Sequence, residues 1–487
     1  MSKAIIIGAG IGGIAAAIRL AVKGFEVDVY EASDSAGGKI KEFIQDGFRF
    51  DAGPSLFTMP QYVEELFLLA GKNPSNYFEY DQLLETCRYF WQDGTYLTGW
   101  ADQNKFAEEV QSKTTATAKQ VQAFLAKSKE IYSITNHVFL EKSLHKIGTY
   151  LNYQTLKSIL RLPKIDAFRT MAKANESFFT DSKMVQFANR YATYNGSNPY
   201  KAPATLNVIP HLEQHFGAYF PKKGMYAITE ALVKLATELG VKFHYNCPVE
   251  KIIVEEAKAS GIRTSIGIHS ADMIISNMDV YFTYQKLLKS EHQPKKILEQ
   301  ERSSSALIFY WGINGSFDQL GLHNIFFSEN YEKEFTAIFN DKSIDTDPTV
   351  YINITSKHKT DDAPEGCENW FTMINVPNNV GQDWDVFIAE ARKNIVDKLS
   401  KNLKTDIEKL IISESVLDPR KIESRTSSYQ GSLYGTSSNN QFAAFLRHAN
   451  FSSAVKDLYF VGGSVHPGGG IPLALLSAKI VGDLVKN

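Results

Sequence analysis

The chain has 487 residues, a length that accommodates more than one domain, and a formal net charge of −2 with lysines and arginines spread along it. A balanced charge of this kind argues against a nucleic-acid-binding protein. Three cysteines, Cys87, Cys247 and Cys367, are too few and too far apart for a disulfide framework or a CxxC redox pair, so we expect a cytoplasmic protein.

The N-terminal stretch KAIIIGAGIGGIAAAIRLAVKGFEVDVYEAS predicts a strand over residues 4–7, a glycine turn, a helix to about residue 23 and a second strand over 26–30. Its uncharged run is shorter than the ~20 residues that a membrane-spanning helix requires, and four glycines interrupt it. We therefore expect neither a signal peptide nor a membrane anchor here.

Within this unit, Gly8, Gly10 and Gly13 match the GxGxxG pattern, and Glu31 follows the second strand. Glycines at these positions let backbone amides approach a pyrophosphate at a helix N-terminus, and a carboxylate after the second strand accepts hydrogen bonds from ribose hydroxyls. The unit predicts a dinucleotide-binding site, and Glu31 would repel a 2′-phosphate.

Two further glycine turns follow, and they bear on the choice between FAD and NAD. The first turn consists of Gly37, Gly38 and Lys39, and the second of Gly53, Pro54 and Ser55. The first places a cation beside the expected diphosphate, and the second is another point where backbone can meet a ligand. A simple nicotinamide-binding Rossmann domain needs neither turn, so the pair favours FAD.

The middle of the chain predicts inserted portions. Residues 106–214 read as mainly helical, a helix from Gly224 to about residue 239 is followed by two strands, and residues 286–425 mix strands with a helix. Segment 146–173 holds six Lys/Arg and one Asp among apolar and aromatic residues. It can be an interfacial segment that contacts anionic lipid headgroups, or a solvated basic face over a helical core.

The C-terminal stretch GGSVHPGGGIPLALLSAKIVGDLVKN predicts a glycine turn that leads into a largely apolar helix. Its candidate ligand-facing residues are Gly463, Gly470, Ile471 and Pro472. Proline suits the first turn of a helix, and glycines let the backbone come close to a ligand or adopt positive φ. A helix N-terminus facing a ligand and a tight turn before a core helix both fit.

The motifs FDAGPS and HPGGGIPLALLSAK, with HSADMIISNMDV between them, resemble the FAD-containing amine oxidase superfamily and its bacterial-type carotenoid (phytoene) desaturase family. The resemblance implies an α/β fold, in which a Rossmann-like FAD-binding domain of the amine oxidase/glutathione reductase type carries an inserted mixed α+β substrate domain and a helical portion. The expected FAD-binding domain is 1–75, 215–285 and 426–487, the substrate domain 76–105 and 286–425, and the helical portion 106–214.

The resemblance also implies roles for individual residues. Gly470, Ile471 and Pro472 would begin the helix whose N-terminus faces the flavin ring, an end that favours the negative charge of reduced flavin. Val249 matches a position against adenine, although an edge strand with a core valine explains it equally well. Lys39 stands where the family usually has arginine. The lysine keeps the positive charge but cannot form bidentate hydrogen bonds.

The implied activity is FAD-dependent desaturation of a carotenoid in carotenoid biosynthesis, in which a hydride moves from an allylic C–H of an apolar polyene to flavin N5. Oxygen or a quinone would reoxidise the flavin. FDAGPSLFTMP and YFWQDGTYLTGW are more similar to the hydroxycarotenoid 3,4-desaturase branch, which implies a hydroxylated or monocyclic substrate. Alternatives are a phytoene desaturase, a carotenoid isomerase, an amine oxidase, or a carotenoid-binding flavoprotein without turnover.

No catalytic base stands out, and hydride loss leaves a cation whose neighbouring C–H is acidic enough for a weak acceptor. The candidates for a substrate tunnel are Arg190, Tyr191, Tyr194, Phe216, Phe220 and His466. Ordinary core packing, or a structural role for His466, explains each of them as well. The sequence has no GxSxG or HExxH motif and no Cys/His spacing typical of a metal site, so we expect no metal.

Overall fold

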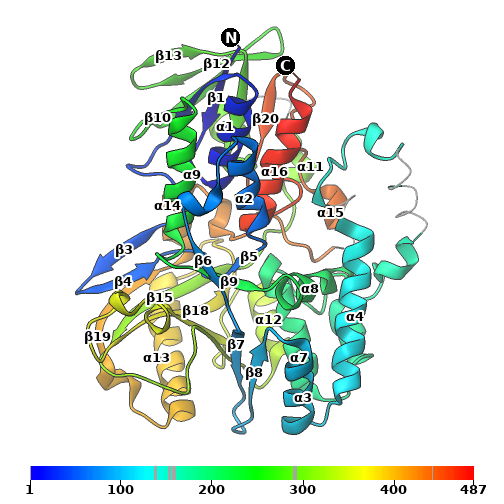
Figure 1. Ribbon diagram of the computed structural model, residues 1–487, viewed down its shortest axis with the longest axis vertical. Helices are drawn as coiled ribbons and strands as arrows, with labels where there is room; N and C mark the ends of the chain where they lie inside the picture. Colours follow the sequence, from blue (N-terminus) through cyan, green and yellow to red (C-terminus); the bar gives the residue numbers. More distant parts are fainter. Residues whose placement is uncertain are drawn as a thin grey trace.

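The computed structural model describes residues 2–136, 140–151, 155, 161–288, 293–440 and 442–486. Figure 1 shows a parallel sheet and its helices at the top, beside both termini, with a larger sheet at the lower left and a group of helices at the lower right.

The parallel sheet joins strands from distant parts of the chain. Its order is β10 (Lys242–His244), β2 (Glu26–Tyr30), β1 (Lys3–Ile7), β14 (Met273–Ser276) and β20 (Leu458–Phe460), and each neighbouring pair is parallel. β1 is buried on both faces, which explains its uninterrupted apolar sequence. Because all five strands point the same way, their carboxyl ends share one sheet edge.

Helices cover one face of this sheet, and a small antiparallel sheet covers the other. Ala4 and Ile6 of β1 pack in the helical layer, whereas Ile5 and Ile7 pack on the opposite side. The helical layer contains α1 (Ile11–Val22), α2 (Gln61–Leu69), α9 (Tyr226–Glu238) and α16 (Ile471–Leu484). The small sheet contains β11 (Val249–Glu255), β12 (Lys258–Thr264) and β13 (Gly267–Ser270). The first and last long helices, α1 and α16, lie side by side (Figure 1).

The second sheet has seven strands and uses its two faces differently. Its order is β19 (Ile411–Leu417), β15 (Ser305–Ile313), β18 (Glu368–Val376), β17 (Val350–Ile354), β16 (His323–Phe326), β7 (Glu85–Phe90) and β8 (Tyr96–Trp100). Leu307 and Trp311 of β15 pack in one core with α13 (Trp384–Leu403). Because side chains alternate along a strand, Ile308 and Tyr310 face the other way, where they line a cavity.

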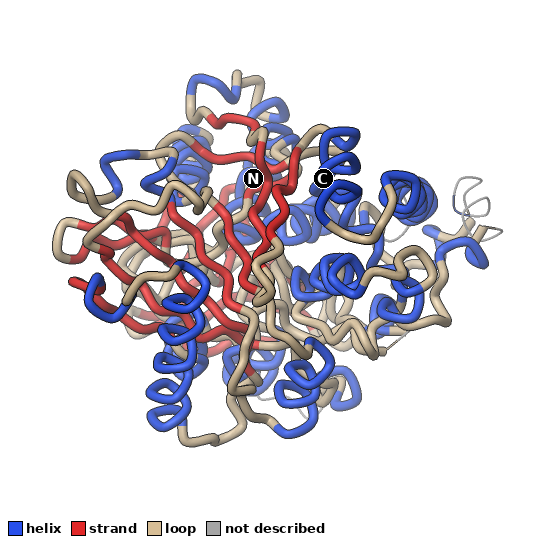
Figure 2. Tube along the Cα trace, turned by 90° about the horizontal axis from the view of Figure 1, so that it is seen from below, coloured by secondary structure: helices blue, strands red, loops and turns tan. Residues whose placement is uncertain are grey.

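The helical portion fills the other side of the molecule, and Figure 2 shows it separated from the strands when seen from below. Its helices are α3 (Gln103–Lys113), α4 (Ala118–Thr135), α6 (Met171–Glu176), α7 (Ser182–Asn189) and α8 (Ile209–Gln214), with short turns η3 (Ile147–Thr149), η4 (Leu162–Ile165), η5 (Arg190–Asn195) and η6 (Ala204–Val208). Asp102, Thr117 and Asp181 cap α3, α4 and α7 by accepting hydrogen bonds from backbone N–H groups.

Shorter elements connect these parts. β3 (Glu42–Gln45) pairs with β4 (Phe48–Asp51), and β9 (Ala218–Pro221) lies between β5 (Phe57–Thr58) and β6 (Tyr80–Gln82). The remaining helical elements are η1 (Pro74–Asn76), α10 (Val280–Phe282), η7 (Thr283–Leu288), α11 (Lys295–Leu298), α12 (Tyr331–Thr336), η8 (Ala337–Asp341), η9 (Thr355–Lys357), η10 (Thr360–Asp362), η11 (Ile407–Leu410), α14 (Pro419–Thr426), η12 (Tyr429–Gly431) and α15 (Ala443–Leu446).

The α/β fold class predicted from the sequence is confirmed by the parallel sheet and its helical layer. The division into three portions stays a proposal. It is supported by the parallel sheet, whose strands all fall within 1–75, 215–285 and 426–487, and by the seven-stranded sheet, whose strands fall within 76–105 and 286–425. Among the described residues, no helix combines the length and apolarity needed to cross a lipid bilayer.

Candidate active site

One large cavity reaches both sheets. Its volume is about 1850 Å³, and its lining comes from the turns at the carboxyl edge of the parallel sheet and from β15, β17 and β18 of the seven-stranded sheet. Ligand pockets usually measure ~300–1,000 Å³. The cavity therefore has room for more than one molecule.

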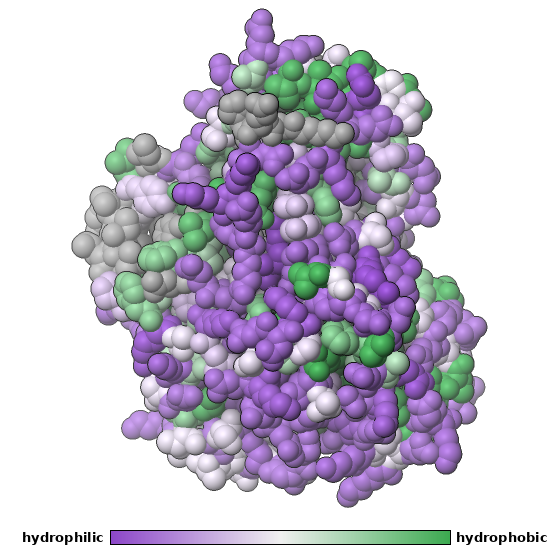
Figure 3. Space-filling view, turned by 180° about the vertical axis from the view of Figure 1, so that it is seen from behind, coloured by the Kyte–Doolittle hydropathy of each residue, from purple (hydrophilic) through white to green (hydrophobic). Residues whose placement is uncertain are grey.

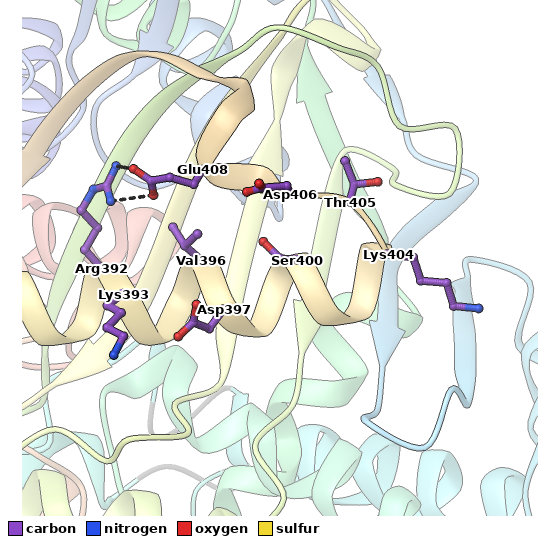
Figure 4. A pocket seen from close by; sticks show the side chains of 9 residues that line it. All are labelled: Arg392, Lys393, Val396, Asp397, Ser400, Lys404, Thr405, Asp406 and Glu408. Atoms are coloured by element: carbon purple, nitrogen blue, oxygen red, sulfur yellow. Dashed lines mark hydrogen bonds and ion pairs between the residues drawn. The ribbon is translucent and has the colours of Figure 1, made fainter.

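A second hollow, shown in Figure 4, lies along α13 and has a volume of about 490 Å³. Its side chains are Arg392, Lys393, Val396, Asp397, Ser400, Lys404, Thr405, Asp406 and Glu408. Arg392 is already paired with Glu408 at 2.8 Å and Glu414 at 2.9 Å, and Lys404 points away from the other side chains. We therefore place the candidate active site in the large cavity.

The N-terminal glycine turn forms one end of that cavity. Gly8 and Gly10 line it, and Gly8 has a φ of 93°. Gly13 has a different role, because a Cβ there would lie 2.2 Å from the carbonyl oxygen of Gly8. Gly13 lets α1 pack closely on the strand, whereas Gly8 and Gly10 leave the helix N-terminus open toward the cavity.

Glu31 lies at the same end, directly after β2. Its carboxylate accepts hydrogen bonds from the backbone N–H groups of Ala9 at 2.7 Å and Ser33 at 2.8 Å. These bonds hold the carboxylate beside the glycine turn, and Glu31 lines the cavity. The arrangement suits a carboxylate that accepts from ribose hydroxyls.

The turn formed by Gly37, Gly38 and Lys39 also lines this end. Both glycines have positive φ, 115° and 61°, and the N–H of Gly37 donates to the carbonyl of Ala9 at 2.8 Å. Burial lowers the pKa of Lys39 to about 8, although the charge of Asp279 opposes that shift. A half-buried ammonium group beside a helix N-terminus fits a diphosphate.

Gly53, Pro54 and Ser55 line the cavity farther along. A Cβ on Gly53 would lie 1.8 Å from the carbonyl oxygen of Lys39, so only glycine permits this close contact between the two turns. The Ser55 hydroxyl is 2.6 Å from the hydroxyl of Tyr351 on β17. This turn therefore connects the N-terminal glycine turns to the seven-stranded sheet.

The C-terminal turn lies along the same cavity. Gly463, Gly470, Ile471 and Pro472 line it, and α16 begins at Ile471 with Gly470 preceding it at a φ of 103°. A Cβ added to Gly470 would have no protein atom within 4 Å among the described residues, so it would project into open space. The N-terminus of α16 is thus exposed to the cavity.

Val249, at the start of β11, also lines the cavity. The structure adds a residue that the sequence motifs did not single out as a contact, Asn277, which follows β14. Its side chain donates to the carbonyl of Gly8 at 3.4 Å, and its Oδ1 would lie 2.7 Å from a Cβ on Gly462. Asn277 therefore lies between the N-terminal and C-terminal glycine turns, and the Ser-Asn landmark in HSADMIISNMDV was its only sequence signal.

Arg447 is a second residue that sequence reasoning missed, and it had no motif around it. It is buried and lines the cavity, and it donates to the carbonyls of Tyr434 at 3.2 Å and Thr436 at 2.9 Å. Burial lowers the pKa of Arg447 to about 10, and nearby Arg302 adds to that shift. A Cβ on Gly468 would lie 3.3 Å from its guanidinium carbon, so this cation lies next to the C-terminal turn.

Two of the predicted tunnel residues, Arg190 and Tyr194, line the cavity. The guanidinium of Arg190 donates to Glu213 at 2.8 Å and to the Tyr194 hydroxyl at 3.1 Å, and the Tyr89 hydroxyl accepts a further bond. The charge of Arg190 is therefore neutralised within the wall. Burial by itself raises the pKa of Glu213, but the Arg190 charge and the hydrogen bonds from Tyr194, Tyr191 and Gln214 together hold it below its ordinary value.

The tunnel prediction needs correction for Tyr191, Phe216 and Phe220, which do not line this cavity. Tyr191 is fully buried, and its hydroxyl donates to Glu213 at 2.9 Å. Phe216 makes edge-to-face contacts with Tyr132 and two histidines, and Phe220 packs in a small separate cluster. Their aromatic character indicated burial, but packing partners decided which way each ring faces.

His466 does line the cavity, yet it is firmly placed by the backbone. Its Nε2 lies 2.9 Å from the carbonyl oxygen of Lys142, and only 1% of the residue is exposed. Burial lowers the pKa of His466 to about 4, so the ring is neutral at physiological pH. These contacts favour a structural role for His466, although the residue also lines the cavity.

The residues at this site fit FAD. Gly8, Gly10 and Gly53 line this end of the cavity, a carboxylate and a half-buried lysine flank them, and the N-termini of α1 and α16 open onto it. The described residues contain no group of three or more His, Cys, Asp or Glu side chains that could hold a metal ion. The chemistry of the cavity therefore depends on a cradle for an anionic dinucleotide and an apolar wall.

Comparisons with known proteins agree with this geometry. Residues 11–306 match the family described as flavin containing amine oxidoreductase. The chain is 51% identical over 487 residues to a Flavobacterium protein named 1-hydroxycarotenoid 3,4-desaturase, covering 100% of this chain and 99% of that protein. It is 35% identical to a Methylomonas protein named 4,4′-diapolycopene oxygenase, covering 99% and 98% of the two chains.

Solved structures share the fold at low sequence identity. An engineered putrescine oxidase has a TM-score of 0.65 at 14% identity, with 99% of this chain and 98% of that chain covered. Cyclohexylamine oxidase from Brevibacterium oxydans has a TM-score of 0.61 at 15% identity, with the same coverage. The chain therefore belongs to the flavin containing amine oxidoreductase family, in its carotenoid desaturase branch, and is an FAD-dependent oxidoreductase.

Proposed function

We propose that this protein introduces a double bond between C3 and C4 of a 1-hydroxylated carotenoid. The observation that carries the proposal is the 51% identity, over the full chain, to a protein named for that reaction. The large cavity supports it, because its wall beyond the cradle contains apolar side chains such as Ile308, Phe371 and Met373, which suit a polyene.

In this reaction the substrate loses two hydrogens as a hydride and a proton, and bound FAD supplies the two-electron acceptor. The chain's own contribution is to hold the polyene against β15 and β18 and to keep water out. The N-terminus of α16 favours negative charge in the cavity, and the Arg447 cation beside it acts in the same direction. A dedicated base is unnecessary, because a polyene cation gives up its neighbouring proton to a weak acceptor.

Which residues contact FAD is also part of the proposal. We assign the diphosphate to Gly8, Gly10 and Lys39, the adenosine ribose to Glu31, and the flavin ring to the turns at Ser55 and Gly470. Their common lining of one cavity supports this assignment. Val249 and Gly463 complete the wall next to these groups.

Pigment extraction tests the proposed reaction. The protein is expressed in cells that supply an acyclic, a monocyclic or a 1-hydroxylated carotenoid. The pigments are then separated, and their masses are measured by mass spectrometry. We expect a product two hydrogens lighter than the hydroxylated substrate. A product that has gained oxygen indicates the activity for which the Methylomonas relative is named, and a product of unchanged mass indicates an isomerase. Either outcome contradicts the proposal, as does a bound but unaltered pigment.

The proposed electron acceptor is oxygen or a quinone. Enzyme reduced by substrate without oxygen should be reoxidised by added air or by a soluble quinone. If neither restores the oxidised absorbance within the time of one turnover, the acceptor is another redox protein.

Contact with a membrane surface would deliver such an insoluble substrate. Phe168 and Phe442 both line the cavity, yet they are 85% and 53% exposed, so they lie where the cavity opens to the surface. Figure 3, the view from behind, shows hydrophobic residues at several separate places on a mostly hydrophilic surface. Of the basic segment 146–173, residues 152–154 and 156–160 lie outside the described residues, and two of its cations are already paired, Lys164 with Glu130 at 3.5 Å and Arg169 with Asp166.

Those pairs weaken the electrostatic part of the membrane prediction, so we propose that insertion of apolar side chains dominates. The holoenzyme should sediment with vesicles of phosphatidylcholine and phosphatidylglycerol, and the Phe168→Ser, Phe442→Ser double variant should not. Ile266→Ser is a matched control, because Ile266 is 71% exposed on the distant β12–β13 hairpin. Equal sedimentation of all three proteins would contradict the proposal.

A further inference from the structure

The wall of the large cavity contains a line of linked polar groups that FAD binding does not explain. The Ser55 hydroxyl is 2.6 Å from the Tyr351 hydroxyl, which is 2.7 Å from Nδ1 of His323. All three residues line the cavity. Tyr351 and His323 lie on the neighbouring strands β17 and β16, so the sheet holds them in a fixed relation.

The direction of these hydrogen bonds follows from a fourth residue. The side-chain nitrogen of Asn353 lies 3.2 Å from Nδ1 of His323, and an amide nitrogen can only donate. Nδ1 is therefore the acceptor, so the Tyr351 hydroxyl also donates to it, and the Ser55 hydroxyl donates to Tyr351. The proton of the neutral imidazole must then lie on Nε2.

That Nε2–H group has no hydrogen-bond partner among the described residues, and His323 is 3% exposed. A buried donor without a partner costs roughly 1–3 kcal/mol, so such a group usually serves a ligand or a water molecule. Burial lowers the pKa of His323 to about 3, which keeps the ring neutral throughout the physiological range. The cavity wall thus presents a permanent N–H donor in largely apolar surroundings.

The position of this donor matches the chemistry of the substrate. In a 1-hydroxylated carotenoid only C2 separates the hydroxyl-bearing carbon from C3, so the hydroxyl group must lie close to the reacting carbons. Ser55 belongs to the turn that we assign to the flavin ring, and the chain of hydrogen bonds runs from that turn to His323. A polar group that recognises the hydroxyl should lie at this short distance from the cofactor turn.

We propose that His323 and Tyr351 form a recognition site for the tertiary hydroxyl of the substrate, and that this site makes the enzyme selective for hydroxylated ends. The inference rests on the proposed 3,4-desaturase function. Nε2–H of His323 donates to the hydroxyl oxygen, and the Tyr351 and Ser55 oxygens each keep a lone pair that can accept the hydroxyl proton. A substrate without the hydroxyl leaves the donor unpaired in the complex.

Arg190 presents another unpartnered N–H, at Nε, on the same cavity wall. Its guanidinium is already bonded to Glu213, Tyr194 and Tyr89. No hydrogen bond among the described residues links Arg190 to the Ser55 turn. We therefore assign hydroxyl recognition to His323 and Tyr351.

The test compares two substrates in the holoenzyme. A 1-hydroxycarotenoid and the same polyene with hydrogen in place of the hydroxyl are supplied in detergent micelles, and kcat/KM is measured for each. Wild type should prefer the hydroxylated substrate. His323→Leu and Tyr351→Phe should lower the preference by about 10- to 100-fold, mainly through the hydroxylated substrate. His323→Gln keeps an N–H donor and should restore part of it.

His358→Leu is the control, because His358 is an exposed histidine that packs near Phe220 and does not line the cavity. It should leave the preference unchanged. If His323→Leu and Tyr351→Phe slow both substrates equally, or if wild type shows no preference, the recognition site is wrong.

A binding measurement separates this site from the proposed function. The visible absorbance of each polyene is titrated with oxidised holoenzyme in the absence of oxygen, using wild type and His323→Leu. If neither polyene is oxidised but wild type binds the hydroxylated one more tightly and the variant does not, the proposed function fails and the recognition site stands. If the polyenes are oxidised without any binding preference, the proposed function stands and the recognition site fails.

Discussion

Nζ of Lys39 donates a hydrogen bond to the carbonyl oxygen of Leu433 at 2.8 Å, joining the turn after β2 to a segment 394 residues farther along the chain. The ammonium group also lies 3.3 Å from the carbonyl of Ser432. Lys39 is half-buried, and the charge of Asp279 partly opposes the lowering of its pKa. The hydrogen-bond acceptors of Lys39 are neutral carbonyls and not a carboxylate. Its positive charge can therefore still pair with an anionic ligand.

Lys39 should make FAD affinity depend on pH. Burial lowers its pKa from 10.5 to about 8 in the free protein, and a bound diphosphate would raise that pKa again. Above about pH 8, FAD binding therefore takes up a proton, and the affinity falls by up to about tenfold per pH unit. Quenching of flavin fluorescence measures the dissociation constant across this range. Lys39→Arg stays charged and should show little change, and an equally steep fall in that variant would rule Lys39 out.

The same pKa predicts the opposite sign for the stability of the protein without FAD. Between about pH 8 and pH 10.5 the unfolded chain holds the Lys39 proton while the folded chain has released it, so the free energy of unfolding rises with pH through this window. Lys39→Met removes that contribution. Denaturant unfolding of wild type and Lys39→Met at both ends of the window should show the larger rise in wild type.

Glu31 should be needed for retention of FAD. Glu31→Arg replaces an acceptor of ribose hydrogen bonds with a cation and removes the acceptor for the N–H groups of Ala9 and Ser33, so the purified variant should contain little FAD. Glu31→Gln keeps one oxygen and should retain more. Glu26→Gln, which alters an exposed pair with Lys242, is the control and should retain the wild-type amount. FAD released by heat is quantified by absorbance, and full retention in Glu31→Arg would place the ribose elsewhere.

Gly470→Val should separate cofactor binding from chemistry. The substitution adds a side chain where φ is 103° and where only open cavity lies within 4 Å, so it strains the backbone and intrudes on the proposed flavin-ring position. The N-terminal cradle is untouched, so FAD is retained with an altered visible spectrum, while reduction by polyene slows by about a hundredfold. Gly240→Val has comparable strain, at a φ of 87° with open space around it, but lies after α9 on the surface. Wild-type spectrum and rate in Gly470→Val would show that this turn serves packing alone.

Arg447 should raise the reduction potential of the bound flavin. A buried cation next to the C-terminal turn stabilises negative charge, so Arg447→Leu should lower the potential while Arg447→Lys largely preserves it. Loss of the bonds to the Tyr434 and Thr436 carbonyls should also lower the melting temperature of Arg447→Leu. Spectroelectrochemical titration measures the potential directly. If Arg447→Leu melts earlier but keeps its potential, the residue is structural.

The sequence predicted the two ends of the cradle because their signals are local. Gly8, Gly10 and Glu31 belong to one short strand–turn–helix–strand unit, and Gly470 with Pro472 marks the start of a helix whatever lies around it. Within 286–425, where the sequence predicts strands and a helix, the structure has β15 and α13. These elements depend on periodicity and capping, which a single sequence carries.

The rest of the site depends on tertiary structure. Asn277 and Arg447 acquire their positions only when β14 and the C-terminal segment reach the edge of the parallel sheet. Likewise, β16 and β17 must pair before His323 and Tyr351 meet. Phe216 and Phe220 were predicted to line the cavity but pack elsewhere, because composition indicates that an aromatic ring is buried without indicating what it faces.

The central claim is that a hydroxylated polyene transfers a hydride to bound FAD in this cavity. Single-turnover reduction without oxygen tests it most directly. Holoenzyme is mixed anaerobically with a 1-hydroxycarotenoid, the visible flavin absorbance is followed, and the pigment is then extracted and analysed. We predict that each equivalent of flavin reduced yields one equivalent of a product two hydrogens lighter, with its new double bond between C3 and C4. Product formed while the flavin stays oxidised, or flavin that stays oxidised with the polyene bound and unchanged, would contradict the account.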